Sequence, residues 1–185
     1  MKKKKLHGFD SDEEWYFSFY LDELYEAGYI SEYELYPDSY ILSDAVFYEY
    51  EKQLKTKTKM IVKKLMREHI YSPDFRIIWA DKARGVFFDS IYGQTNLLKV
   101  PFITISDNIS IVEIKPVFDQ NNMTRLFITN QKWMYHKLGI YVQKIVPVKL
   151  FEQTFTPKRY LLTDKSGKPR KLKYQPRSLE TFVKT

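Results

Sequence analysis

The chain has 185 residues, of which 44% are hydrophobic, and a net charge of +7 at pH 7, so it is long and apolar enough for one domain with a hydrophobic core. It contains no run of 18 apolar residues, no apolar segment after the basic start Met1–Lys5, and no cysteine. These absences argue against a membrane span, a secretory signal, disulfides and thiolate metal sites, and they favour a cytoplasmic protein.

The two signs of charge are concentrated in different parts of the chain. Residues 6–51 contain 13 Asp and Glu and no Lys or Arg, whereas residues 156–185 contain nine basic and two acidic residues. A basic segment favours contact with a polyanion, although a solvated tail has the same composition. We expect a domain over residues 1–155, followed by a basic C-terminal tail or hairpin over residues 156–185.

The chain opens with a predicted helix. Residues 11–27 fit a helix because Ser11 is a good N-cap, Glu14 stands three residues later as a capping box requires, and Gly28 can end the helix. Glu14 also shares a stripe with the apolar residues of this helix, whereas Glu13 points more to the side. Glu14 is therefore the better candidate for an inward-facing acid.

Strands follow this helix. Residues 33–42 and 67–80 are rich in aromatic and branched side chains and predict strands, with Pro37 favouring an edge or a bulge in the first. Residues 44–54 are ambiguous. Residues 55–64 alternate and place lysines on one face of a strand, where they either face phosphates or protect an unpaired strand edge.

The second half of the chain predicts a hairpin, a helix and a strand. Residues 81–100 resemble a loop or an insertion, and residues 101–105 and 110–118 predict two strands of a hairpin around the triplet Ser106-Asp107-Asn108. The pattern further predicts a helix over 121–139 that ends at Gly139, a strand over 140–151, and a basic hairpin that turns at Lys165-Ser-Gly-Lys168.

One strand carries a pair of charges on one face. Glu113 and Lys115 are two residues apart and therefore project to the same side of the strand. A salt bridge alone would account for them. Alternatively, Glu113 and Asp74 can share Mg²⁺ from neighbouring strands, because this ion prefers oxygen ligands, while Lys115 acts on a metal-bound water or on negative charge in the transition state.

The helix over 121–139 offers a further candidate. Gln131 and Tyr135 are four residues apart and share a helix face, so Gln131 or its neighbour Lys132 can reach a phosphate or the metal-bound water. A polar residue on an ordinary amphipathic helix would give the same pattern.

The order of these motifs resembles the PD-(D/E)XK nuclease superfamily. The matching residues are Glu14 on a helix, Pro73-Asp74 at a strand, Glu113-Ile114-Lys115 on a later strand, and a following helix and strand, over residues 11 to about 148. The stretch from Gln131 to Tyr135 is similar to a Gln-x-x-x-Tyr signature of some members. The resemblance implies an α/β fold with a central mixed β-sheet flanked by helices, the restriction-endonuclease-like αβββαβ core.

The resemblance also implies a metal site and a set of catalytic residues. Asp74, Glu113, the main-chain carbonyl of Ile114 and Glu14 would bind Mg²⁺, with Mn²⁺ as a substitute, and Lys115 would act on the nucleophilic water. One departure from the family is the separation of 39 residues between Asp74 and Glu113. Either an insertion fills residues 81–105, or another acid replaces Asp74; the alternatives are Asp89, Asp81 and Asp107.

The function expected from the resemblance is metal-dependent endonucleolytic hydrolysis of DNA. The small size and basic tail are similar to those of small phage-type endonucleases and Holliday-junction resolvases, which select branched DNA and act as homodimers. Two alternatives stay open. One is a restriction-type or transposon-end-cleaving subunit of a larger DNA-processing complex; the other is a non-catalytic nucleic-acid-binding or virion protein in which Glu113 and Lys115 form a structural pair.

Overall fold

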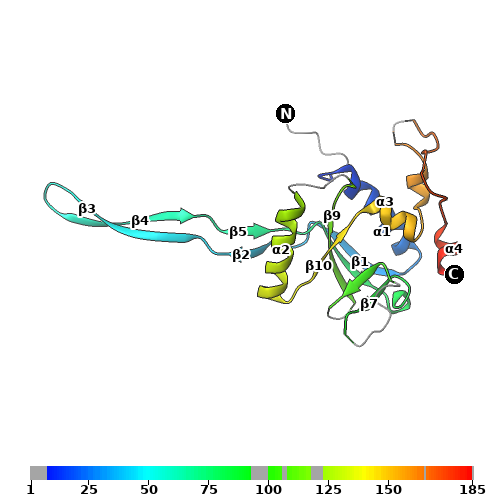
Figure 1. Cartoon of the computed structure of the whole chain (residues 1–185), viewed down its shortest axis with the longest axis horizontal. Helices are drawn as coiled ribbons and strands as arrows, with labels where there is room; N and C mark the ends of the chain where they lie inside the picture. The colour runs from blue at the N-terminus through cyan, green and yellow to red at the C-terminus, as the bar shows by residue number, and fades with distance from the viewer. Residues whose placement is uncertain (1–7, 93–99, 106–107, 118–122, 165, 185) are drawn as a thin grey trace.

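The computed structural model describes residues 8–92, 100–105, 108–117, 123–164 and 166–184 as a mixed α/β structure. Its centre is a four-stranded mixed sheet with the order β1 (Ile30–Leu35), β6 (Phe75–Trp79), β9 (Ile109–Ile114) and β10 (Val142–Ile145). Strand β6 is antiparallel to both β1 and β9, whereas β10 runs parallel to β9. In chain order, the helix α1 (Asp12–Glu26) precedes β1, and the helix α2 (Met123–Leu138) connects β9 to β10 (Figure 1).

The first helix forms as its sequence predicts. The N–H of Glu14 donates to the Ser11 hydroxyl oxygen at 3.2 Å, which satisfies one of the N–H groups that the first helical turn leaves unpaired. After the helix, Gly28 adopts φ +72°, a left-handed conformation that favours glycine. The predicted helix over 11–27 is therefore confirmed, with both of its end signals.

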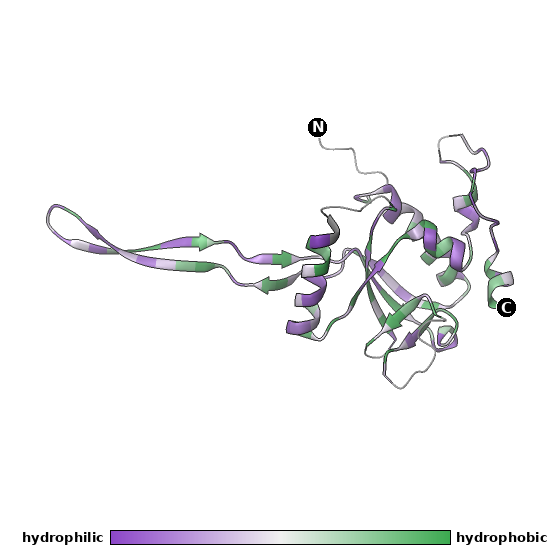
Figure 2. Ribbon diagram, in the orientation of Figure 1, coloured by the Kyte–Doolittle hydropathy of each residue, from purple (hydrophilic) through white to green (hydrophobic). Residues whose placement is uncertain are grey.

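The two faces of the central sheet are buried differently. Phe75, Ile77 and Trp79 of β6 alternate toward the face covered by α1 and by α3 (Pro147–Gln153), where aromatic side chains from all three elements form the main core. The opposite face carries a smaller cluster that includes Ile111 of β9 and Met134 of α2. Figure 2 shows the apolar colouring of the central strands between these layers.

Two predicted strands are each divided by the structure. The stretch 33–42 supplies the end of β1 and most of β2 (Tyr40–Ser43), and the stretch 67–80 contains β5 (His69–Tyr71) and β6. Strand β2 pairs with β5 and not with the central sheet. The predictions of single strands are wrong at these breaks, because Tyr36 takes a left-handed φ of 52° before Pro37, and Pro73 interrupts the second stretch.

Residues 46–66 form a long hairpin that extends away from the rest of the molecule (Figure 1). The ambiguous stretch 44–54 contains β3 (Val46–Gln53), and the alternating stretch 55–64 contributes to β4 (Thr58–Met66). Lys55 and Lys57 lie in the turn between the strands, so only Lys59 of the predicted lysine row lies within a strand. We call residues 46–66 the arm.

The insertion between Asp74 and Glu113 is present, but the predicted hairpin within it is not. The described residues of 81–105 form a short 3₁₀ helix (Asp81–Ala83), β7 (Phe88–Ser90) and β8 (Phe102–Thr104). Strand β8 pairs in parallel with β7, and β9 pairs with β6 and β10. Both edges of β9 are thus paired within the central sheet, so β8 does not pair with it as the predicted hairpin requires. The predicted turn residues Ser106 and Asp107 lie outside the described residues.

The end of the predicted domain also differs from the expectation. The helix predicted over 121–139 is confirmed over Met123–Leu138, and Gly139 follows it with φ +68°. The strand predicted over 140–151 is wrong beyond Ile145, because Pro147 begins α3 at a position where its missing N–H costs no hydrogen bond.

The C-terminal segment folds back onto the main core. It contains a 3₁₀ turn (Lys158–Leu161) and α4 (Leu179–Val183), and the side chains of Tyr160 and Leu179 belong to the main apolar cluster. The basic hairpin forms a backbone bridge between Leu162 and Pro169, with Lys165 outside the described residues. Part of the basic segment therefore contributes to the folded core.

We predict that Leu179→Ala lowers the free energy of unfolding by about 2–4 kcal/mol, because Leu179 is only 5% exposed and its truncation leaves a cavity. The matched control Leu162→Ala, at a side chain that is 48% exposed in the same segment, should change it by less than about 0.5 kcal/mol. Chemical denaturation measures both. Equal small effects would mean that the segment does not stabilise the core.

Candidate functional site

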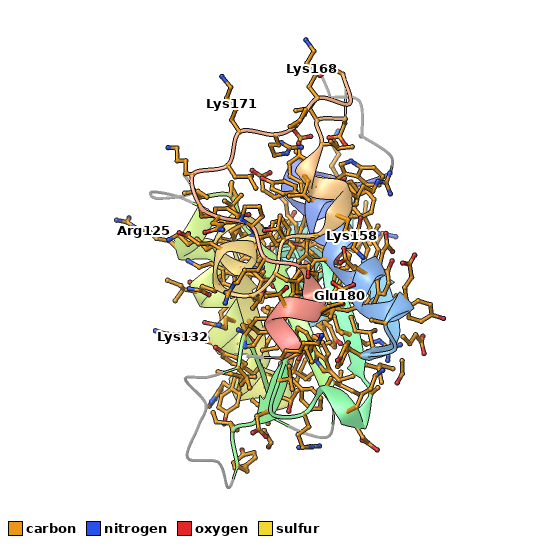
Figure 3. All side chains as sticks on the ribbon, turned by 90° about the vertical axis from the view of Figure 1, so that its right-hand side faces the viewer. Arg125, Lys132, Lys158, Lys168, Lys171 and Glu180 are labelled. Carbon is orange, nitrogen blue, oxygen red and sulfur yellow. The ribbon has the colours of Figure 1, made fainter. Side chains whose placement is uncertain are left out.

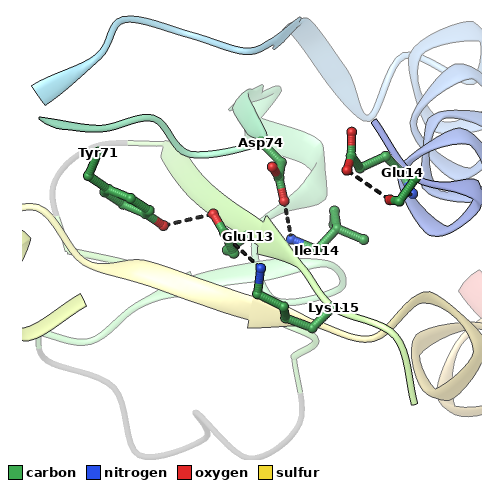
Figure 4. A network of polar contacts seen from close by, with 7 residues as sticks. Glu14, Tyr71, Asp74, Glu113, Ile114 and Lys115 are labelled. Carbon is green, nitrogen blue, oxygen red and sulfur yellow. Dashed lines mark hydrogen bonds and ion pairs between the residues drawn. The ribbon is translucent and has the colours of Figure 1, made fainter. Parts of the chain in front are cut away.

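Asp74 lies where the chain returns from the arm to the central sheet. It lies between β5 and β6, and its main-chain N–H donates to the carbonyl of Val112 on β9 at 3.1 Å. Its side-chain Oδ2 accepts a hydrogen bond of 2.6 Å from the N–H of Ile114, on the same strand (Figure 4). Backbone and side chain together hold the carboxylate beside the residues that follow on β9.

Glu113 lies between a tyrosine and a lysine. The ammonium of Lys115 is 2.7 Å from its Oε1, and the hydroxyl of Tyr71 donates to its Oε2 at 2.8 Å. Glu113 is 9% exposed, and its contact with Lys115 arises because the two residues alternate onto one face of β9. The predicted proximity of Glu113 and Lys115 is confirmed (Figure 4).

Glu14 approaches the same region from α1. It is 5% exposed, and it accepts hydrogen bonds from the Ser11 hydroxyl at 2.8 Å and the Tyr36 hydroxyl at 2.6 Å. Glu13 is less buried, which agrees with the choice of Glu14 as the inward acid of the helix. The capping role and an inward position therefore coexist in one side chain.

Asp74 is close enough to Glu113 and to Glu14 to be influenced electrostatically by both. The pKa of Asp74 is raised to about 8, first by burial, then by the charge of Glu113 and, less strongly, by that of Glu14. The hydrogen bond from Ile114 and the charge of Lys115 oppose this rise. Burial and the neighbouring Glu113 also raise the pKa of Tyr71, so its hydroxyl remains a hydrogen-bond donor.

The predicted residues of α2 do not join this group through any contact among the described residues. The Gln131 amide donates to the carbonyl of Val142 at 2.7 Å and thereby connects α2 to β10. Lys132 and Tyr135 are exposed, and Figure 3 shows Lys132 pointing away from the body of the molecule. Gln131 thus has a structural contact that its sequence pattern did not reveal.

The alternative acids lie elsewhere. Asp89 is buried on β7, where it accepts from the N–H of Ser90 and lies 3.9 Å from Arg84. Asp81 is exposed in the 3₁₀ helix, and Asp107 lies outside the described residues. Of Asp74, Asp81 and Asp89, which lie among the described residues, Asp74 is the one that hydrogen-bonds to the strand of Glu113.

The carboxylate oxygens near Asp74 are of the chemical kind that a hard divalent cation prefers. Asp74 and Glu113 supply carboxylate oxygens from adjacent strands, Glu14 is electrostatically coupled to Asp74, and Ile114 links the two strands by its hydrogen bond to Asp74. Mg²⁺ prefers such oxygen ligands and retains several waters. Among the described residues, no group of three or more acidic or histidine side chains is placed so that it could hold a metal ion.

Three neighbouring residues were missed by the sequence analysis. Tyr71 and Tyr36 donate to Glu113 and Glu14, and Lys144 lies directly beside Glu113 in the parallel register of β9 and β10. A tyrosine at a strand end carries no distinctive sequence signal. Lys144 follows Gln143 within β10, so its charge does not stand out in the sequence, and its proximity to Glu113 depends on sheet register.

No family model matches the sequence, and no curated protein or solved structure matches it significantly. In the part of the chain that the structure describes, no helix is both long and apolar enough to cross a membrane. Functional inference therefore depends on the geometry of the site and on the motif resemblance.

We predict that Asp74→Asn stabilises the metal-free protein at pH 8, on the order of 1–3 kcal/mol. The pKa of Asp74 is about 8 in the folded state and about 3.9 when unfolded, so the folded state binds more protons in this window. Wild-type stability therefore falls as pH rises from about 4 to 8, and the asparagine variant lacks this loss.

Denaturation in chelator at several pH values from 4 to 8 measures this difference. The raised pKa of Asp74 would be contradicted if the free energies of unfolding of the wild-type protein and the variant differed by the same amount at every pH.

Proposed function

We propose that the protein is a metal-dependent DNA endonuclease whose site consists of Asp74, Glu113, Lys115 and Glu14. The observation that carries the proposal is the junction of two strands. Asp74 binds the N–H of Ile114 at 2.6 Å, and the flanking residues Glu113 and Lys115 are themselves 2.7 Å apart. Two acids and an amine are thus held together by strands from distant parts of the sequence.

The arrangement of the core supports this proposal. The elements α1, β1, β6, β9, α2 and β10 follow one another in the αβββαβ order expected from the resemblance to PD-(D/E)XK nucleases. The candidate residues occupy α1, the position just before β6, and β9 with the residue after it, as that resemblance implies. The β2–β5 pair, the arm and the β7–β8 insertion are additions to this order.

The site residues have distinct roles in the proposed reaction. Asp74, Glu113 and the carbonyl of Ile114 would hold Mg²⁺, with Mn²⁺ as a substitute, and Glu14 would complete the acidic surroundings. When bound, the ion supplies Lewis acidity and lowers the pKa of a bound water. Lys115 orients the nucleophilic water and neutralises charge that develops on the phosphate, and Tyr71 holds the Glu113 carboxylate in place.

DNA is the proposed substrate because cationic side chains are available outside the site. The exposed Lys168 and Lys171 project from the C-terminal segment, whereas Lys158 pairs with Glu180 at 3.3 Å (Figure 3). Contacts to phosphate select shape and charge more than sequence, which suits branched DNA such as a Holliday junction. Two symmetric cuts in such a junction require two sites, hence a proposed homodimer.

We predict that the wild-type protein cleaves DNA with Mg²⁺ or Mn²⁺ and not with chelator, and that Asp74→Asn and Lys115→Ala each lower the cleavage rate about 100-fold or more. The matched control is Lys82→Gln, because the exposed ammonium of Lys82 donates to the carbonyl of Ala27 in a surface contact. It should retain wild-type activity. The measurement compares linear, flapped and four-way DNA.

Two outcomes would contradict parts of this proposal. Absence of divalent-dependent cleavage on all three substrates would leave Glu113 and Lys115 as a structural pair. Equal rates on linear and four-way DNA would remove the preference for branched substrates and leave the nuclease assignment.

A further inference from the structure

The arm has almost no contact with the body of the protein. All eight residues of β3 are exposed, and of the nine residues of β4 only Ile61 is partly buried. The arm extends well beyond the central sheet and its helices (Figure 1). A two-stranded ribbon that buries so little of its own surface gains little stability from packing, so its sequence is available for contacts with a partner.

The two faces of the arm carry different charges. Directly opposed residues of an antiparallel pair share a face, so the register assigns every side chain. We define the basic face by Tyr48, Tyr50, Lys52, Lys59, Ile61 and Lys63, and the acidic face by Phe47, Glu49, Glu51, Met60, Val62 and Lys64. The basic face has three lysines and no carboxylate, whereas the acidic face has two glutamates and one lysine.

The lysines of the basic face are placed unfavourably for an isolated hairpin. Lys52 lies directly opposite Lys59, and like charges in this position destabilise the pair. Among the described residues, neither of them nor Lys63 forms an ion pair, whereas Lys64 on the acidic face lies 3.6 Å from Glu68. A polyanion against the basic face would remove this repulsion.

Tyrosines and the turn extend this surface. The rings of Tyr48 and Tyr50 stack with centroids 5.9 Å apart on the basic face, and tyrosine hydroxyls contact phosphate and sugar in protein–DNA complexes. Lys55 and Lys57 add two positive charges at the tip. Lysines that only protect strand edges have no reason to gather on one face.

The root of the arm runs directly into the candidate site. Strand β5 follows the arm and ends at Tyr71, which donates to Glu113, and Asp74 lies three residues further on. The two chain segments that lead to and from the arm meet where the N–H of Tyr36 donates to the carbonyl of Asp74 at 2.8 Å. Helix α2 holds this root through Lys137, which donates to the carbonyl of Ile41 at 3.0 Å.

We propose that the basic face of the arm binds duplex DNA and guides it to the site at Asp74 and Glu113. From Tyr71 at the site to Lys57 at the tip is 14 residues, roughly 45 Å of extended chain at about 3.3 Å per residue, which is somewhat more than one helical turn of DNA (about 34–36 Å). The major groove, about 12 Å wide, admits a two-stranded ribbon. The inference rests on the proposed function and adds to it a substrate-binding surface.

A second copy of the chain fits the basic face less well. A symmetric dimer through this face would bring the lysines of both copies together, and the basic face of neither copy has a carboxylate to compensate them. Charge complementarity therefore favours a polyanionic partner.

Neighbouring lysines on β4 allow a matched test. Lys63→Gln and Lys64→Gln remove the same charge at adjacent positions but on opposite faces. Binding of a linear duplex of about three helical turns is measured with the full chain in chelator, over a range of salt concentrations. Lys63→Gln should weaken binding severalfold and Lys64→Gln should leave it near the wild-type value, while the triple Lys52, Lys59 and Lys63→Gln variant should weaken it tenfold or more.

The salt dependence gives an independent measure of phosphate contact. The triple variant should reduce the slope of log affinity against log salt by up to about 0.9 for each lysine removed. Equal effects of Lys63→Gln and Lys64→Gln, or an unchanged slope in the triple variant, would overturn the inference. A change in sedimentation mass with unchanged DNA affinity would also overturn it, because the face would then bind a second copy.

Failure of this inference is distinguishable from failure of the proposed function. Binding is measured without divalent ions, whereas cleavage is measured with the wild-type protein and Mg²⁺. If the wild-type protein cleaves DNA and the face variants bind it as the wild type does, the arm is not the binding surface and the nuclease proposal stands. If the triple variant loses binding but the wild-type protein does not cleave, the arm binds DNA and the nuclease proposal fails.

Discussion

The structure depends on how Asp74 is held at the place where the chain returns to the central sheet. Its carboxyl group is buried beside Glu113 and near Glu14, so its ionisation would add negative charge where water is largely excluded. The N–H of Ile114 and the ammonium of Lys115 offset part of this cost. A group of acids that is costly to bury and only partly compensated is typical of sites that bind cations or transfer protons.

The unequal burial of the two sheet faces makes such a site possible. The face toward α1 and α3 carries the larger aromatic core, which holds β6 and β9 in register. The face toward α2 has the smaller apolar cluster, and it leaves room for Glu113, Lys115 and Tyr71 next to Ile111. The packing of β6 and β9 against the larger core fixes their positions, and these strands in turn position the polar side chains on the face with the smaller core.

The arm and the site share one element of the fold. The segment from Tyr36 to Asp74, which includes the arm, leaves the central sheet after β1 and returns to it at β6. The N–H of Tyr36 donates to the carbonyl of Asp74, so Asp74 lies where the two ends of this segment meet. Tyr71, at the end of β5 in the same segment, donates a hydrogen bond to Glu113. A partner bound along the arm is therefore mechanically connected to the side chains of the site through a few residues of extended chain.

Local signals in the sequence determined those elements whose cause is local. The N-cap Ser11 with Glu14, Gly139 after α2, and the alternation that brings Lys115 to Glu113 were all predictable, because each depends on residues a few positions apart. Only the tertiary structure decided the break at Tyr36, the pairing of β8 with β7, and the contact of Gln131 with Val142. These features depend on which distant strands compete for each edge and on the space left at the sheet surface, and neither is encoded in a short stretch of sequence.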